Sequence, residues 1–488
     1  MRGRGTSEPF IVNHSAINVD SCDVGQATPI DVLPDDVLLA IFDFCVAGVR
    51  DQETKRAVES WQSLVHVCRR WRRLVFESPR RLNLRLVCTP RTPAKGTLDV
   101  WPALPLITRG AFEFSSGVDN IIIALGHHNR VRRTELWITL GSHLDKVFAA
   151  MHVPFPALDH LWLHCEDETA PVLPNSFLGG SAPQLRYLQL ERVPFPGLPK
   201  LLLSATHLVY LYLHGIPHSG YFSPEAIVNS LSVLTSLGTL SLEFPSPQSR
   251  PDRESQHPPP ISRSVLPALT GFWFKGVSEY LEDLVVWIDA PQLDVLYITF
   301  LHQIRFNTPR LVQFVSRTPR FKEPQEVDVN FCFDAAEVRL MSCTSSDYGE
   351  LAVEIPCEEW DQQLEFMAQV CTMCLPPLPT VETLGVYVKD TYSQQDWDDD
   401  VENNQWLELL RPFTAVKDLY LSKDFQQGIA SALQELVGGR TTEVLPSLQK
   451  ISLLDFEPSE LLQEAIGRFV DARQLSGHPI TVLPLWSG

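Results

Sequence analysis

The sequence predicts a mixed α/β fold, in which a small helical unit near the N-terminus is followed by a long, irregular solenoid of short strands and helices. Two observations support this prediction. Apolar residues recur at helical spacing between positions 33 and 75, and a strand-like pattern of apolar residues returns every 23 to 32 residues between positions 158 and 293. These are the periods at which a helix or a strand presents one side to a core.

Composition limits the classes of function. The chain has 488 residues, enough for one large or two to three ordinary domains. Its net charge of −19 argues against a nucleic-acid-binding surface, which needs a basic patch to replace counterions. The ten cysteines are scattered and are typical of reduced core residues in an intracellular protein. No apolar run approaches the ~18 residues that a membrane helix requires.

Three segments are expected to lie outside the packed elements. Residues 1–29 mix Gly, Ser, Asn and Asp without an apolar stretch, which predicts a disordered N-terminus and argues against a signal peptide. Residues 245–260 contain six prolines, and residues 390–405 are acidic, so both are expected to be loops. Together these features are typical of a soluble protein of the cytoplasm or the nucleus, and the sequence favours neither compartment.

The first structured segment is expected at residues 30–84. One apolar stripe falls at positions 33, 37, 38, 41, 42 and 45, and a second at 61, 64, 65, 68, 71, 74 and 75. Each stripe is one face of a helix. Pro34 suits the first helical turn, and Asp35 and Asp36 suit the positive end of the helix dipole. A unit this small usually exposes part of its apolar surface to a partner.

This segment resembles the F-box, and in particular the F-box of fungal proteins. The resemblance rests on three motifs: the Leu33-Pro34 opening with Val37, Leu38, Ile41 and Phe42 behind it, the run Val67-Cys68-Arg69-Arg70-Trp71-Arg72, and the Leu82 to Leu84 exit. The interval 46–60 departs from the family, because it is longer and more charged than the usual connection. The alternative is an ordinary helical hairpin that feeds a larger core.

F-box proteins dock on the Skp adaptor of cullin-RING ubiquitin ligases, and the resemblance implies that role here. The implied adaptor-binding residues are Leu33, Pro34, Val37, Leu38, Ile41, Val67 and Trp71. Some of these side chains must also hold the unit together, and Trp71 is expected to be shared between core and interface. The arginine run at 69–73 is expected on the solvated or adaptor-facing side of its helix.

After residue 150 one pattern returns, with apolar residues at its first, fourth and sixth positions. Copies start at 158, 185, 208, 237, 269 and 293, and again at 381, 416 and 448. Most intervals among the first six overlap the 20–29-residue period of leucine-rich repeats. Because a single strand cannot bury its apolar side, such units stack. Residues 85–488 therefore resemble an irregular leucine-rich-repeat horseshoe, with another α/β arrangement of strands as the alternative.

Two parts of this segment lack a clear repeat. Residues 85–150 are expected to hold capping units, with strands at 82–86 and 136–138. Residues 305–375 keep an alternation typical of strands but lose the repeat frame. One or two degenerate units are expected there.

No motif supports a catalytic, cofactor or metal site. Cys371 and Cys374 have the spacing of a redox or zinc half-site, but zinc needs four ligands and no second pair lies nearby. They are expected to be core residues at a helix end. His160 and His164 flank a strand, where an exposed binding surface explains them better than metal ligation. P-loop, dinucleotide-binding and Gly-x-Ser-x-Gly motifs are absent.

Between the last two apolar residues of each copy, one position faces the opposite side of the sheet. Five of these nine positions hold Trp or Tyr, although the chain has only 21 such residues. Large aromatic side chains on an open face favour a protein partner. The predicted target-binding residues are Trp162, Tyr212, Trp273, Tyr297 and Tyr420. The alternative is that loops such as 245–260 cover these rings.

Together the resemblances imply a non-catalytic substrate receptor. The F-box would bind the Skp adaptor and, through it, the cullin-RING ligase, and the repeat segment would bind an unknown protein target. The chain would contribute proximity and orientation to ubiquitin transfer. A scaffold that binds the adaptor without directing ubiquitylation is one alternative, and an enzyme with an unrecognised site is another. The sequence does not identify the target or say whether it must be modified.

Overall fold

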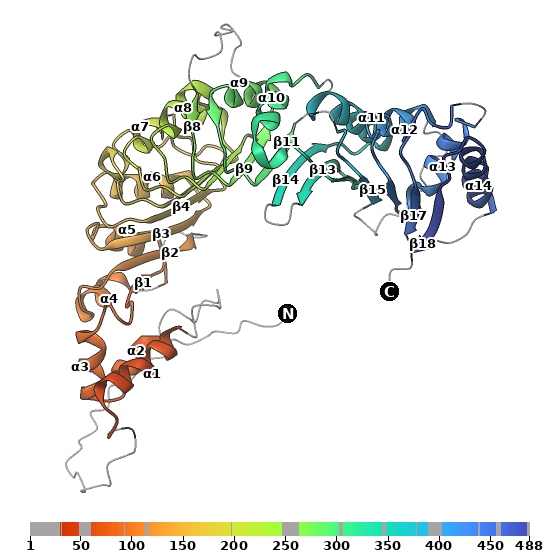
Figure 1. Cartoon of the computed structure of the whole chain (residues 1–488). Helices are drawn as coiled ribbons and strands as arrows, with labels where there is room; N and C mark the ends of the chain where they lie inside the picture. The colour runs from red at the N-terminus through yellow and green to blue at the C-terminus, as the bar shows by residue number, and fades with distance from the viewer. Residues whose placement is uncertain are drawn as a thin grey trace, which may run out of the picture. The chain divides into compact units, whose positions relative to one another are not determined.

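The protein's computed structural model divides into two compact units, residues 1–84 and 85–488 (Figure 1). The described residues are 30, 32–47, 60–91, 93–112, 117–196, 198–245, 263–301, 306–343, 348–376, 378–388, 403–437, 440–454 and 460–485. The expected N-terminal segment 1–29 and nearly all of the two expected loops at 245–260 and 390–405 lie outside them.

The first unit consists of three helices, α1 (Asp35–Ala47), α2 (Ser60–Val65) and α3 (Arg69–Glu77). Its core takes apolar side chains from all three helices and from the turn that follows, each at most 7% exposed: Leu38, Leu39, Phe42, Trp61, Val65, Leu74, Val75, Leu82 and Leu84. The strand expected at 82–86 is wrong over its first residues. Asn83 has a positive φ of 48°, and residues 82–83 form a turn.

In the described part of the second unit, sixteen strands form one sheet. The first nine are parallel and follow chain order: β1 (Leu86–Cys88), β2 (Leu106–Phe112), β3 (Val131–Ile138), β4 (His160–Cys165), β5 (Tyr187–Glu191), β6 (Tyr210–His214), β7 (Thr239–Glu243), β9 (Gly271–Gly276) and β11 (Val295–Phe300). The last four are also parallel and in order: β15 (Thr383–Val388), β16 (Asp418–Leu421), β17 (Lys450–Leu454) and β18 (Thr481–Leu485).

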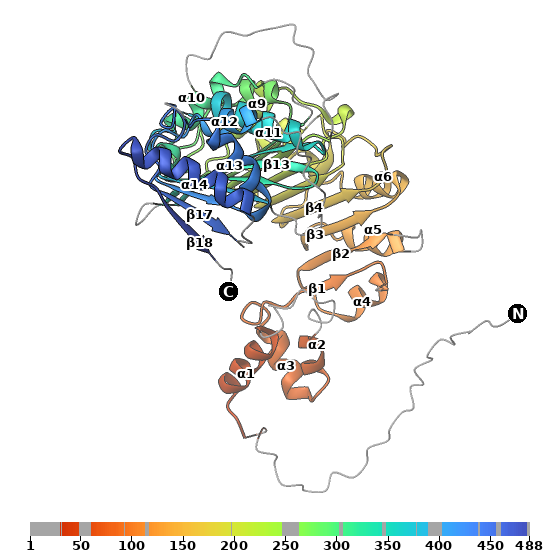
Figure 2. The same ribbon diagram turned by 90° about the vertical axis from the view of Figure 1, so that its right-hand side faces the viewer.

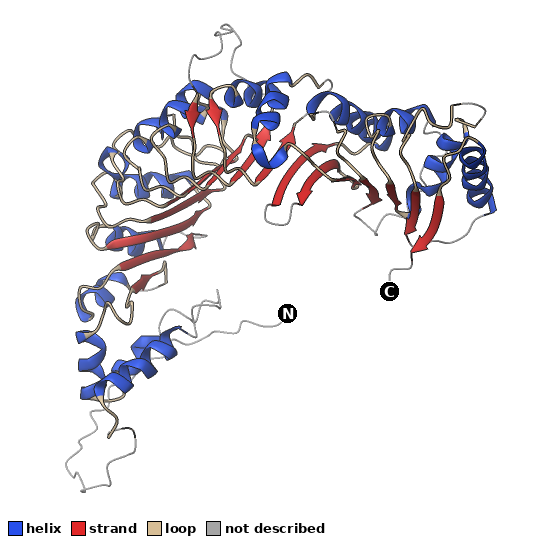
Figure 3. Ribbon diagram, viewed as in Figure 1, coloured by secondary structure: helices blue, strands red, loops and turns tan. Residues whose placement is uncertain are grey.

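Helices lie along one side of this sheet (Figure 3). They are α4 (Ala94–Val100), α5 (Val118–Leu125), α6 (Gly141–Ala150), α7 (Leu198–Leu202), α8 (Pro224–Leu231), α9 (Ser278–Val285), α10 (Pro309–Arg317), α11 (Trp360–Gln369), α12 (Asn403–Leu410), α13 (Gln426–Gln434) and α14 (Glu460–Leu475). Figure 2 shows α13 and α14 over β17 and β18. A small parallel pair, β8 (Ser264–Val265) and β10 (Ile288–Asp289), contacts α8 and α9. We call the opposite side of the sheet the open face.

Neighbouring strands keep the second apolar position of each repeat, its fourth residue, in register. Pairing runs from strand to strand through Leu161, Leu188, Leu211, Leu240, Phe272 and Leu296. All six side chains are completely buried. Each repeat therefore covers the apolar row of its neighbours, as a stacked solenoid requires. The unit is a mixed α/β solenoid of leucine-rich-repeat type with a long, mostly parallel sheet.

The same turn precedes many of these strands. The N–H of the first apolar residue of the repeat donates to the carbonyl three residues earlier, from Leu158 to Phe155 (3.2 Å), from Leu185 to Ala182 (3.2 Å) and from Leu293 to Ala290 (3.2 Å). In each case a proline follows the accepting residue. Its fixed φ suits the second position of such a turn. The recurring prolines of the sequence therefore set the point at which each strand begins.

Residues 305–375 differ from the one or two degenerate repeats that the sequence predicts. They contribute β12 (Glu326–Phe331), β13 (Ala335–Cys343) and β14 (Tyr348–Pro356). The sheet order is β11-β14-β13-β12-β15, and β13 is antiparallel to both neighbours. After β11 the chain leaves two strand positions of the sheet vacant and forms β12. It then returns as β13 and β14, which occupy those two positions. Leu340 and Leu351 still continue the buried apolar row.

The expected capping region contains three strands, β1 to β3, and the expected strand at 136–138 is the end of β3. Two threonines occupy the row that leucines fill elsewhere. Thr108 pairs in register with Thr134, and Thr134 pairs with Leu161. Both threonines are completely buried, and the Thr108 hydroxyl donates to the Thr134 hydroxyl at 2.9 Å. This bond satisfies two polar groups that burial would otherwise penalise.

Arg473 of α14 closes the C-terminal end of the solenoid. It is completely buried, and its guanidinium donates to the carbonyls of Thr441 (3.0 Å), Pro446 (3.1 Å) and Leu448 (3.1 Å). We predict that Arg473→Met destabilises the last repeats by about 3 kcal/mol, because these buried carbonyls lose their donors. Hydrogen exchange of the β17 and β18 amides measures the effect locally.

Arg468→Met is the matched control on the same helix. Arg468 pairs with Glu464 at the surface, and such pairs contribute at most about 1 kcal/mol. Equal exchange rates in the two variants would contradict the structural role of Arg473.

Candidate functional site

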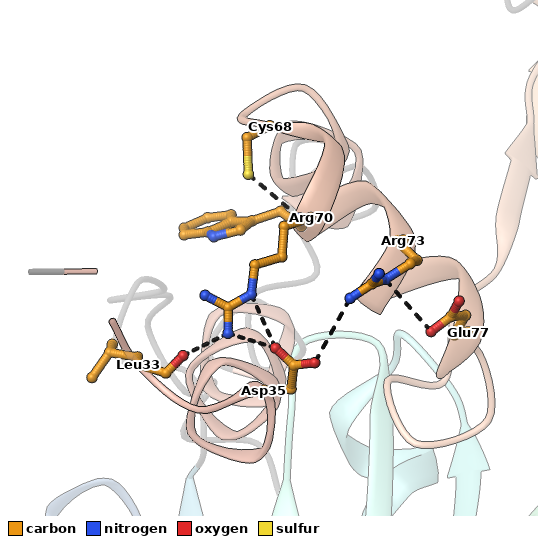
Figure 4. A network of polar contacts seen from close by, with 7 residues as sticks. Leu33, Asp35, Cys68, Arg70, Arg73 and Glu77 are labelled. Carbon is orange, nitrogen blue, oxygen red and sulfur yellow. Dashed lines mark hydrogen bonds and ion pairs between the residues drawn. The ribbon is translucent and has the colours of Figure 1, made fainter. Parts of the chain in front are cut away.

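An arginine–aspartate contact joins the ends of the first unit's helices. The Arg70 guanidinium of α3 donates to Asp35 at the start of α1, from Nε at 3.0 Å and from Nη2 at 2.5 Å. Its Nη2 also donates to the Leu33 carbonyl at 2.6 Å, and Arg73 lies 4.0 Å from Asp35 (Figure 4). Part of the arginine run therefore fixes the start of α1 instead of facing solvent.

The helix α3 begins with a sulfur cap. The Trp71 N–H donates to the Cys68 Sγ at 3.5 Å, and Arg72 donates from Nε to the Val65 carbonyl at 2.9 Å. The Trp71 ring packs on Phe42, with 4.7 Å between centroids. Cys68 thus caps α3, and Trp71 and Arg72 join α3 to α1 and α2.

The seven residues implied to bind the adaptor differ in the solvent exposure of their side chains. Leu38 is completely buried, so its side chain belongs to the core. Leu33 and Trp71 are half-buried, and Pro34 is exposed. Val37 (42%), Ile41 (38%) and Val67 (59%) are exposed, as is Phe44 (79%). Val37, Ile41 and Phe44 share one face of α1 by their spacing of four and three residues. We call these three residues the α1 apolar face.

On the open face, the strand register places the predicted target-binding positions in one row. Trp162 pairs through Gln189 with Tyr212, and Ser241 connects Tyr212 to Trp273, which pairs with Tyr297. Gly385, Tyr420 and Ser452 continue the row at the other end of the sheet. The row therefore places Trp162, Tyr212, Trp273 and Tyr297 on β4, β6, β9 and β11, and Tyr420 lies apart beyond the β12–β14 insertion.

This row and the two rows that flank it on the open face form an aromatic cluster on β3 to β6. Its members are Trp137, His160, Trp162, His164, Tyr187, Tyr210, Tyr212 and His214. His160 stacks on Tyr187 with 4.0 Å between centroids and 10° between planes. The ring centroid of Trp137 lies 4.0 Å from that of His164 and 6.4 Å from that of Trp162. The ring centroids of Tyr187 and Tyr212 are 5.6 Å apart. Tyr210 (44%) and Trp137 (38%) are exposed, so the cluster is available to a partner.

Trp273 extends the aromatic surface to β9. A Cβ added to Gly271 would lie 2.3 Å from the Trp273 ring, so the ring rests on the glycine two residues earlier in the same strand. The Trp273 side chain is 37% exposed. Only glycine leaves room for a ring in that position. The alternative that loops cover the rings does not hold for Trp273 in the described residues.

A buried carboxylate lies beside the aromatic cluster. Glu135 of β3 is 4% exposed and contacts Arg109 at 2.8 Å, His160 at 3.3 Å and Arg133. Burial by itself would raise the pKa of Glu135, but the hydrogen bond from His160 and the charges of Arg133 and Arg109 outweigh it and lower the pKa. The carboxylate is therefore ionised at neutral pH, and its bond orients the His160 ring that stacks on Tyr187.

A second polar group lies where the strand order changes. Tyr297 donates to Glu354 at 2.6 Å, and Arg339 contacts Glu337 at 3.0 Å and Glu350 at 3.2 Å. Burial raises the pKa of Tyr297, and the Glu354 carboxylate raises it further. Tyr297 therefore remains a neutral phenol that donates a hydrogen bond.

Sequence reasoning did not assign Trp137 and Glu135 to this surface. The repeat frame is recognisable only from Leu158, because Thr134 stands where the frame expects an apolar residue. The pair Leu136 and Ile138, separated by Trp137, was the available signal. Placing that pair in the frame would have put Trp137 on the open face.

The two cysteines with the spacing of a redox or zinc half-site lie in the protein interior. Cys371 and Cys374 are buried in the π-helical segment Val370–Cys374. Burial raises the pKa of both thiols, that of Cys374 to about 12, which disfavours the thiolates that bind metals or react. Among the residues that the structure describes, no group of three His, Cys, Asp or Glu is placed to hold a metal ion. Within the same residues, no helix is both long and apolar enough to cross a membrane.

Comparison with known proteins identifies no family. No family model matches the chain, and no curated protein matches it. One similar solved structure is the leucine-rich repeat-containing protein LegL7 from Legionella pneumophila, with 12% identity, 82% of this chain and 99% of that chain covered, and a TM-score of 0.27. At that TM-score the likeness carries no argument, and the repeat architecture rests on the register and turns described above.

The lowered pKa of Glu135 leads to a prediction about how the stability of the fold depends on pH. Because its folded-state pKa lies below the ordinary value of 4.5, its ion pairs stabilise the fold above pH ~4.5 and lose that effect as the pH falls through the folded-state pKa. We predict that Glu135→Gln lowers stability at pH 7 and flattens the acid-induced loss below about pH 5. Urea unfolding at pH 7 and at pH 3.5 measures both.

Glu168→Gln, at an exposed carboxylate of the same unit, is the control. It should leave the wild-type pH dependence unchanged. A Glu135→Gln variant with the same acid-induced loss as the wild type would contradict the ion-pair account.

Proposed function

We propose that the chain is the substrate-recognition subunit of a Skp–cullin–F-box ubiquitin ligase. The first unit binds the Skp adaptor, and the open face of the second unit binds a target protein. The observation that carries the proposal is the α1 apolar face of Val37, Ile41 and Phe44, which is exposed directly behind the Leu33-Pro34 opening that resembles the F-box.

Exposure of the α1 apolar face supports a partner for the first unit. Phe44 is 79% exposed and Val37 is 42% exposed, although burying a side chain of this kind is worth about 1.5–3 kcal/mol. The unit's own core is already complete with Leu38 and Phe42. Apolar side chains that a small core leaves outside are typical of an interaction surface.

Rigid helix ends support the same assignment. Arg70 holds both Asp35 and the Leu33 carbonyl, so the opening of α1 is fixed relative to α3. A preformed surface loses less conformational entropy on binding than a mobile one. Arg70, conspicuous in the sequence as part of the arginine run, then acts as a positioning residue for the adaptor face.

The aromatic cluster supports the target-binding role of the second unit. Trp and Tyr dominate many protein interfaces because they bury a large area at a small entropic cost. Here their rings are ordered by mutual stacking and by the bond between His160 and Glu135. Ubiquitin transfer would then occur on other subunits, and this chain would supply proximity and orientation.

The adaptor prediction uses surface residues, so that the unit stays folded. We predict that Val37→Ser with Ile41→Ser weakens binding of the Skp adaptor at least tenfold, about 1.4 kcal/mol. Asp36→Ser, exposed on the same helix, should bind as the wild type does. Calorimetry with purified adaptor measures both, and undiminished binding by the double variant would refute the adaptor face.

The target prediction uses two rings of the open face. We predict that Trp162→Ala with Trp273→Ala abolishes capture of the target and leaves adaptor binding intact. The control pair is Leu203→Ala with Val233→Ala, at apolar residues that follow α7 and α8 and are 51% and 36% exposed. Quantitative mass spectrometry of crosslinked partners compares the variants, and a target retained by the tryptophan variant would refute this site.

Ubiquitylation of the captured target distinguishes a ligase receptor from a scaffold. In reconstituted reactions with cullin and adaptor, a receptor yields ubiquitylated target. A scaffold yields a stable complex of chain and adaptor without modification of any bound protein.

A further inference from the structure

A groove opens at the edge of the sheet where β3, β4 and β5 begin. It has a volume of about 490 Å³ and is lined by Arg130, Arg132, Arg186, Asn129, Gln184 and Asp159 among others. We propose that this groove binds an acidic segment of the target, rich in Asp or Glu. The inference rests on the proposed function of the second unit and specifies the chemistry of its target.

The charge of the groove is opposite to that of the chain. Three guanidinium groups face one carboxylate, that of Asp159, although the whole chain carries a net charge of −19. Asp159 is already bound by Arg132, from Nε at 2.5 Å. Arg186 is exposed and makes no ion pair with any residue that the structure describes. The groove therefore has an excess of positive charge that its own residues do not neutralise.

Two of the arginines are positioned by the backbone. The pairing of β2 with β3 shifts register between Leu106 and Ile107, so that Arg132 is the extra residue of a bulge. A bulge redirects a side chain at the rim of a sheet. Arg130 is held by the carbonyls of Leu104 (3.0 Å) and Pro102 (3.3 Å). Both side chains are thus fixed at the edge before any ligand arrives.

The spread of the arginines favours a run of carboxylates over one phosphate group. Arg130 immediately precedes β3 and Arg186 immediately precedes β5, which is two strand positions away. Two strand spacings amount to ~10 Å. An extended peptide places alternate side chains ~7 Å apart, so successive acidic side chains can reach both arginines. The Arg132–Asp159 contact shows that a carboxylate fits a guanidinium of this groove.

The groove also adjoins the aromatic cluster. Arg186 is followed directly by Tyr187, whose ring stacks on His160 on the open face. A bound segment can therefore place acidic residues at the edge and apolar or aromatic residues on the rings. Charge at the edge would speed association and select partners, and the rings would supply most of the affinity.

The test uses the purified full-length chain and labelled nine-residue peptides. One peptide alternates Glu and Ala, a second alternates Gln and Ala, and a third contains a single phosphoserine among alanines. We expect the Glu peptide to bind at least tenfold more tightly than the Gln peptide in fluorescence anisotropy at low salt. Binding should weaken as salt rises, because exposed ion pairs are screened.

The matched variants are Arg186→Gln and Arg192→Gln. Arg186 immediately precedes β5 and Arg192 immediately follows it, and both side chains are exposed. Arg186→Gln should weaken binding of the Glu peptide at least fivefold. Arg192→Gln should leave that binding unchanged. Equal losses in the two variants would overturn the groove as the site. Equal binding of the Glu and Gln peptides would overturn the acidic ligand, and tighter binding of the phosphoserine peptide would replace it with a phosphate ligand.

These outcomes are independent of the adaptor. Adaptor binding is measured on the same preparations and depends on residues 30–84. Loss of adaptor binding with peptide binding intact refutes the ligase role alone. Intact adaptor binding without Glu-peptide binding refutes the groove proposal alone.

Discussion

Register between neighbouring strands is the constraint on which the second unit depends. A strand of five or six residues buries nothing alone, so each apolar row exists only because the next strand covers it. A slip of one residue would turn every leucine to solvent and every open-face ring into the core. The turns that end at Leu158, Leu185 and Leu293 prevent this, since each starts its strand at the same point of the repeat. The order of the aromatic cluster follows from the same register.

The β12–β14 insertion shows how far this constraint can be satisfied without repetition. An antiparallel strand also alternates its side chains between two faces, so β13 can carry Leu340 in the buried row. Its open-face positions, however, are free of the repeat sequence. In the row that contains Trp162, β13 holds Arg339 and β12 holds Asp328, where the parallel strands β4 to β9 hold aromatic or uncharged polar residues. The insertion therefore interrupts this row with charged residues before Tyr420.

The sequence predicts the features that repeat. It misses the places where another interaction replaces the repeated apolar residue. The frame from Leu158 to Ile298 is visible because leucines recur, and it correctly aligns Trp162, Tyr212 and Trp273 in one row. The frame fails before residue 150 because Thr108 and Thr134 satisfy each other by a hydrogen bond that only the structure reveals. Likewise, the resemblance to the F-box implied that Leu38 and Val37 lie together on the adaptor face. Three-dimensional packing then separated them, since Leu38 is buried and Val37 is 42% exposed.

Charged residues fix the geometry of both candidate surfaces, although aromatic and apolar residues supply their area. Arg70 fixes the opening of α1 through Asp35, and Glu135 fixes the His160 ring that stacks on Tyr187. Apolar contacts are non-directional, so they alone would leave these surfaces less well defined. Hydrogen bonds to charged groups are directional and stronger than neutral ones. Selective recognition by this chain would therefore depend on a few ionised side chains placed at the margins of larger apolar surfaces.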